Sequence, residues 1–65
     1  MSTNIADIAS RITLAVRLLE NDSYHLAAAI ANEDFEEVKI LNVEMTNRRN
    51  RIGRLQDELI KAVNN

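Results

Sequence analysis

Two heptad repeats of hydrophobic residues, one on each side of the polar segment Asn32-Glu33-Asp34, most constrain how this 65-residue chain can fold. Spacings of three and four residues place such side chains along one side of an α-helix. The a and d positions are Ile5, Ile8, Ile12, Ala15, Leu19, Asp22, Leu26 and Ala29, followed by Val38, Leu41, Met45, Arg48, Ile52, Leu55, Leu59 and Ala62. Because two such seams can pair, the sequence predicts an all-α fold, an antiparallel hairpin of two long helices.

The predicted hairpin forms a single domain over residues 1–65. We expect one helix over about 4–31, a turn at 32–34 and a second helix over about 35–63. Asp34, followed three residues later by Glu37, is typical of a helix start.

The segment Asn21-Asp22-Ser23 contains three poor helix formers in succession, and a break there would give three helices. Leu19 and Leu26 nevertheless keep the heptad phase across it, and neither glycine nor proline marks a stop. We therefore favour one continuous first helix.

Composition indicates that the hairpin needs a partner. A chain of this length buries little surface by itself, and without cysteine it cannot form a stabilising disulfide. No apolar run approaches the roughly 20 residues that span a bilayer, and the first residues lack the pattern of a secretory signal. The net charge of −2 gives no overall attraction to nucleic acid. We expect a cytoplasmic protein that does not enter membranes.

The two sides of the seam differ in composition. On the g side, Arg11 is expected to face Glu58, and His25 to face Glu44. On the e side, the hydrophobic surface extends beyond the seam at Ala9, Val16, Ile30, Phe35 and Val63. Leu14, Leu18, Ile40, Val43 and Ile60 lie further round, and two helices cannot bury all of these between themselves. The simplest partner is a second copy, which predicts a homodimer that forms a four-helix bundle.

Two seam positions hold charged residues in neighbouring layers. Asp22 in the first repeat and Arg48 in the second could reach each other across the antiparallel pair. Their structural interpretation is an ion pair that fixes the register of the helices. The functional alternative is a polar site in the middle of the bundle.

The segment from Arg48 to Arg54 holds four arginines, and its composition is that of an arginine-rich helix that binds RNA. The candidates for RNA contact are Arg49, Arg51 and Arg54. In architecture alone, the chain also resembles the dimeric helical-hairpin RNA-binding regulators found on plasmids. The other interpretation is a solvated basic stripe, since no aromatic residue lies in the segment to stack on bases.

No pattern indicates catalysis or a cofactor. The chain has no cysteine, a single histidine and no glycine-rich phosphate loop. Asp22, His25 and Glu44 supply metal-ligand types, but Arg48 beside Asp22 would repel a cation, so we expect no metal. The sequence thus predicts a non-enzymatic homodimer that binds a further protein as a regulator, inhibitor or assembly factor. Its small size and lack of targeting signals suit an accessory protein of a phage or another mobile element. RNA binding is the alternative, and no small-molecule substrate is expected.

Overall fold

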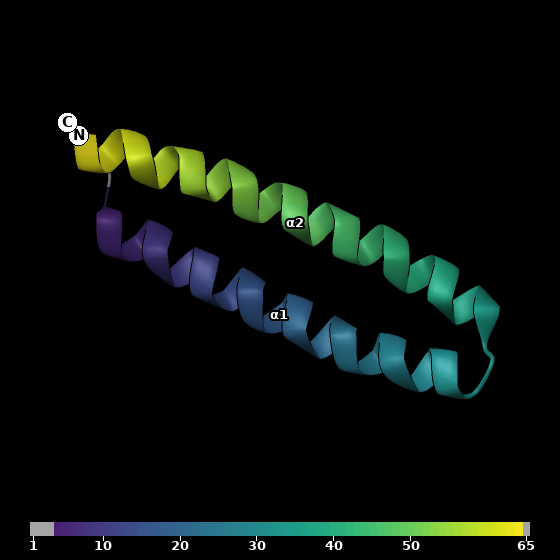
Figure 1. Cartoon of the computed structure of the whole chain (residues 1–65). Coiled ribbons are helices and arrows are strands. Elements are labelled where there is room, and N and C mark those ends of the chain that lie inside the picture. The colour runs from purple at the N-terminus through teal and green to yellow at the C-terminus, as the bar shows by residue number, and fades with distance from the viewer. Residues whose placement is uncertain (1–3, 65) are drawn as a thin grey trace.

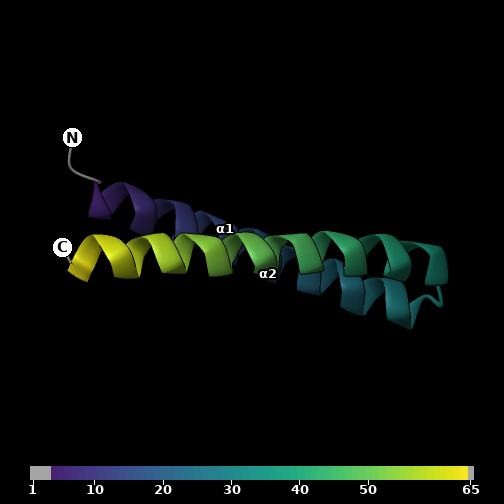
Figure 2. The same cartoon turned by 90° about the horizontal axis from the view of Figure 1, so that it is seen from above.

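The computed structural model describes residues 4–64 as two helices that pack antiparallel, which confirms the predicted hairpin (Figure 1). Helix α1 spans Ile5–Ala31 and helix α2 spans Phe35–Asn64. The start of α1 and the end of α2 lie at one end, which we call the open end, and the turn lies at the other (Figure 1). Seen from above, the two helices cross at a shallow angle (Figure 2).

Helix α1 begins at an asparagine cap and continues without a break through its polar middle. The Asn4 side chain accepts a hydrogen bond from the backbone N–H of Asp7 at 3.1 Å, which satisfies one of the free donors at a helix start. Further along, the Ser23 hydroxyl donates to the Leu19 carbonyl at 3.0 Å, so its polar group stays within the helix. The prediction of one continuous first helix is confirmed.

The turn is closed by backbone hydrogen bonds that end α1 and by a side-chain cap that starts α2. The Glu33 N–H donates to the Ile30 carbonyl at 3.1 Å, and the Asp34 N–H donates to the Ala29 carbonyl at 2.9 Å. This is a Schellman ending, and Glu33 takes its left-handed position at φ 57°. The Asp34 carboxylate then accepts from the Glu37 N–H at 3.2 Å, as a helix start at Asp34 requires.

The core is one layer of side chains between the two helices. Its buried hydrophobic members are Ile8, Ala15 and Ala29 from α1 and Leu41, Met45 and Leu55 from α2. The other heptad positions are buried or half-buried, apart from Ile5 at the open end, which is exposed. The heptad phase therefore identified the packed side of both helices.

The hairpin is long and thin, with extents of 49 × 15 × 14 Å. Its accessible surface is 5041 Å², whereas a compact monomer of 7.4 kDa would expose about 4200 Å². A single layer of core side chains accounts for this difference, because the outward faces of both helices remain in solvent. Several hundred Å² of surface are thus available to a partner.

Candidate interaction surfaces

The two charged seam residues form an ion pair across the hairpin. The Nε of Arg48 donates to Oδ2 of Asp22 at 2.5 Å. The Asp22 side chain is 7% exposed and that of Arg48 is 31% exposed. A carboxylate buried to this degree needs its partner, because an unpaired buried charge is strongly destabilising. The structure thus brings Asp22 and Arg48 together in the way the register predicts.

One side of the seam exposes several large hydrophobic side chains and carries few charged residues. We call it the apolar flank; it comprises the e and neighbouring b positions of both helices, and its hydrophobic members include Ala9, Val16, Ile30, Phe35, Ile60 and Val63. Ile30, Phe35, Ile60 and Val63 are each between 55% and 63% exposed. The charged residues at these positions within the described helices are Glu20, Lys39 and Arg49.

The opposite side is densely charged. We call it the arginine flank; it comprises the g and neighbouring c positions. Its charged residues are Asp7, Arg11, Glu37, Glu44, Arg51, Arg54, Glu58 and Lys61. Leu14, Leu18 and Ile40 lie among them and are also exposed. Hydrophobic side chains are therefore exposed on both flanks, whereas charge is concentrated on one.

The ion pairs on this charged side differ from the expected ones. Arg11 pairs with Asp7 on its own helix at 3.0 Å, one turn away, instead of crossing to Glu58. Within residues 4–64, no ion pair joins His25 to Glu44. A partner four residues away on the same helix is already within reach, so a cross-helix contact has little advantage for an exposed arginine.

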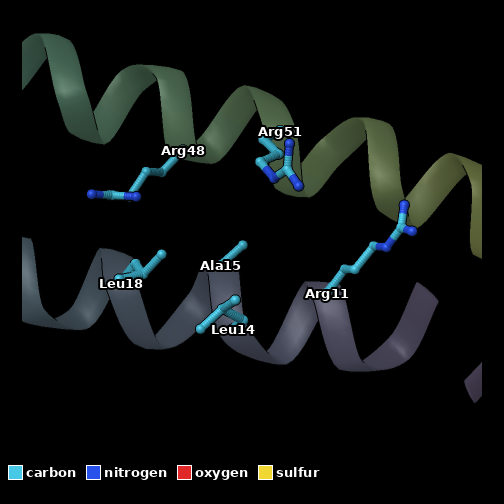
Figure 3. A pocket seen from close by; sticks show the side chains of 6 residues that line it. All are labelled: Arg11, Leu14, Ala15, Leu18, Arg48 and Arg51. Carbon is cyan, nitrogen blue, oxygen red and sulfur yellow. The ribbon is translucent and has the colours of Figure 1, made fainter. Parts of the chain in front are cut away.

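Three arginines surround a shallow hollow of about 260 Å³ on the arginine flank. We call it the arginine hollow; its lining residues are Arg11, Leu14, Ala15, Leu18, Arg48 and Arg51. In Figure 3, Arg11 extends from α1 toward α2, while Arg48 and Arg51 come from α2 opposite the two leucines. Arg11 was predicted only to face Glu58 and not to belong to such a cluster. The antiparallel register could have found it, because g positions of the two helices face each other.

The three arginines predicted to contact RNA do not share one side of α2. Arg49 belongs to the apolar flank, whereas Arg51 and Arg54 belong to the arginine flank. Residues two apart on a helix point away from each other. An RNA groove that contacts one side of the hairpin would therefore reach at most two of these three arginines.

Other kinds of site lack support in the part of the chain that the structure describes. No cluster of three or more His, Cys, Asp or Glu residues there could hold a metal ion. Neither of the two described helices has a stretch long and apolar enough to cross a membrane.

Comparison with family models, curated proteins and solved structures found no match to this chain.

Proposed function

We propose that this protein is a small, non-enzymatic interaction protein that forms a homodimer through its apolar flank and acts on a further protein as a regulator, inhibitor or assembly factor. The observation that carries the proposal is the exposure of four large hydrophobic side chains on a side of the hairpin that carries few charged residues. Depletion of charge together with exposed hydrophobic groups is typical of the centre of a protein interface.

The positions of these side chains favour pairing along the full length of the hairpin. Ile30 and Phe35 lie beside the turn, and Ile60 and Val63 lie near the open end. Two copies aligned over their whole length would cover both clusters, whichever way the second copy runs. The product is a four-helix bundle, in which each hairpin supplies the second layer that the other lacks.

The energies are of the right order for such a dimer. Burying the rest of a half-exposed Ile, Val or Phe side chain contributes about 1–2 kcal/mol. Two copies provide these four side chains twice, and association costs about 4–15 kcal/mol. The apolar flank therefore supports a dimer whose affinity depends on each of its large side chains.

The experiment compares two variants of matched exposure on opposite sides of α2. Phe35→Asp places a charge on the apolar flank at a helix start, where an acidic side chain does not weaken the helix. Ile40→Asp places the same charge on the arginine flank. Light scattering after size exclusion gives the mass of each variant and of the wild type at several concentrations, and circular dichroism checks that each remains helical.

The proposal predicts a dimer for the wild type and for Ile40→Asp, and a monomer for Phe35→Asp. A wild type that remains monomeric at every concentration contradicts it, as does a Phe35→Asp variant as dimeric as the wild type. Absorbance at 260 nm is recorded on the same peaks. Co-eluting nucleic acid would favour the RNA-binding alternative over a protein partner.

A further inference from the structure

We propose that the arginine hollow is the docking site for the further partner, and that it binds an amphipathic helix carrying a carboxylate side chain beside aliphatic ones. This inference rests on the proposed function as an interaction protein, and it specifies the surface and the chemistry of the partner. It does not use the apolar flank, so a dimer leaves the hollow free.

The charge of the hollow favours an anion. Arg11, Arg48 and Arg51 all line the hollow, and the guanidinium of Arg48 points away from those of the other two (Figure 3). Asp22 engages Arg48 through its Nε, and Asp7 engages Arg11 through one Nη. Within residues 4–64, no acidic side chain forms an ion pair with Arg51. Because a guanidinium has five N–H donors, the site retains several that can bind a carboxylate oxygen.

The two leucines that line the hollow favour a partner with an aliphatic side chain beside its carboxylate. Leu14 and Leu18 are 58% and 38% exposed, and they lie four residues apart on the same side of α1. A free anion would leave both leucines in water. A helix presenting Asp or Glu one turn from Leu or Ile would pair with the arginines and cover the leucines at once, which is the helix-in-groove mode of recognition.

The same surroundings disfavour a nucleic acid. The two aromatic residues of the chain, Tyr24 and Phe35, do not line the hollow, so no aromatic ring there can stack on a base. Glu44 lines an adjoining hollow together with Arg48 and Arg51. A phosphate backbone running along the groove would bring several negative charges toward that carboxylate, whereas the proposed partner helix brings one.

The test uses two short, acetylated helical peptides made of Leu, Ala and either Glu or Gln, with Leu one turn from the polar residue. Each is titrated into methyl-labelled protein while the Leu14 and Leu18 signals are followed by NMR. The proteins are the wild type, Arg51→Glu and a matched control, Arg17→Glu, on the outward side of α1. Oligouridine is titrated at the same salt concentration, and the mass of each protein is measured by light scattering.

We expect saturable shifts at Leu14 and Leu18 with the Glu peptide. Binding should weaken about tenfold or more with the Gln peptide and with Arg51→Glu, in line with the loss of one charge-assisted contact. Arg17→Glu should bind as the wild type does.

Three binding results would overturn the inference. They are no saturable binding of the Glu peptide, equal loss in Arg17→Glu and Arg51→Glu, or tighter binding of oligouridine than of the Glu peptide. Conversion of Arg51→Glu to a monomer would also overturn it, because the hollow would then belong to the contact between copies. A monomeric wild type that still binds the Glu peptide would refute only the dimer, so the two proposals fail separately.

Discussion

The two flanks of the hairpin expose comparable hydrophobic side chains and differ in the charges around them. Ile60 on the apolar flank is 57% exposed and Leu14 on the arginine flank is 58% exposed. The first lies on the side whose charged residues are Glu20, Lys39 and Arg49, and the second lies beside an arginine-lined hollow. By exposed fraction alone, Ile60 and Leu14 would be assigned to the same kind of interface. The number of charged residues separates them, because a side with few charges suits a second copy, whereas a side with many charges of both signs suits a partner that forms specific ion pairs with it.

The largest expected effect comes from breaking the Asp22–Arg48 ion pair, which fixes the register of the two helices. Arg48→Met leaves Asp22 buried and unpaired, and we expect a loss of about 4 kcal/mol in the free energy of unfolding. The double variant with Asp22→Leu should recover most of this loss, since both partners become hydrophobic. Urea denaturation measures both variants. If the double variant were as unstable as Arg48→Met, the unpaired charge of Asp22 would not be the cause of the lost stability.

The next largest effect is expected when the same substitution is compared on the two flanks. Ile60→Lys and Leu14→Lys make the same change at matched exposure on opposite flanks. A symmetric dimer contains each site twice, so at about 1.5 kcal/mol a site Ile60→Lys should raise the dimer Kd roughly 100-fold. Leu14→Lys should change it less than threefold. Sedimentation equilibrium gives both constants, and equal effects would remove the distinction between the flanks.

A smaller effect concerns Gly53, at the outer edge of the apolar flank. A Cβ added there would meet nothing within 4 Å in the hairpin, and alanine favours a helix over glycine by about 1 kcal/mol. Gly53→Ala should therefore stabilise the dilute monomer by about that amount in thermal unfolding. A destabilised monomer would contradict this packing. The dimer Kd of the same variant shows whether a second copy reaches this edge.

The smallest effect is expected at the turn, which belongs to neither flank. Glu33 has φ 57°, a conformation that glycine adopts more readily than glutamate. Glu33→Gly should raise the free energy of unfolding by about 0.5 kcal/mol in urea denaturation, with both dimer and peptide Kd unchanged. A shift in either Kd would mean that the turn takes part in an interface.

The seam of this fold could be predicted because helical periodicity is local. Heptad spacing identified the packed side of both helices, and it brought Asp22 within reach of Arg48. The cap of α2 was equally local: the Asp34 carboxylate accepts a hydrogen bond from the backbone N–H of Glu37, three residues on.

The register places Arg11 and Arg51 on the same side of the seam, but it does not define the arginine hollow, because the shape of the hollow depends on which rotamers these long side chains adopt. Arg11 pairs with Asp7 on its own helix, a choice that the heptad positions do not determine. The turn shows the same limit. Asparagine tolerates the left-handed conformation better than glutamate, yet Asn32 has φ −90° and Glu33 takes that position. There the pattern of backbone hydrogen bonds outweighs the local preference.

The proposed position of the dimer interface is tested most directly by identifying which methyl groups of one copy contact another copy. Mixing isotope-labelled with unlabelled protein allows contacts between copies to be detected by filtered nuclear Overhauser spectroscopy. Pairing through the apolar flank predicts such contacts from Ile30, Ile60 and Val63, and none from Leu14 or Leu18. Contacts from the two leucines, with none from the apolar flank, would contradict it and place the dimer on the arginine flank.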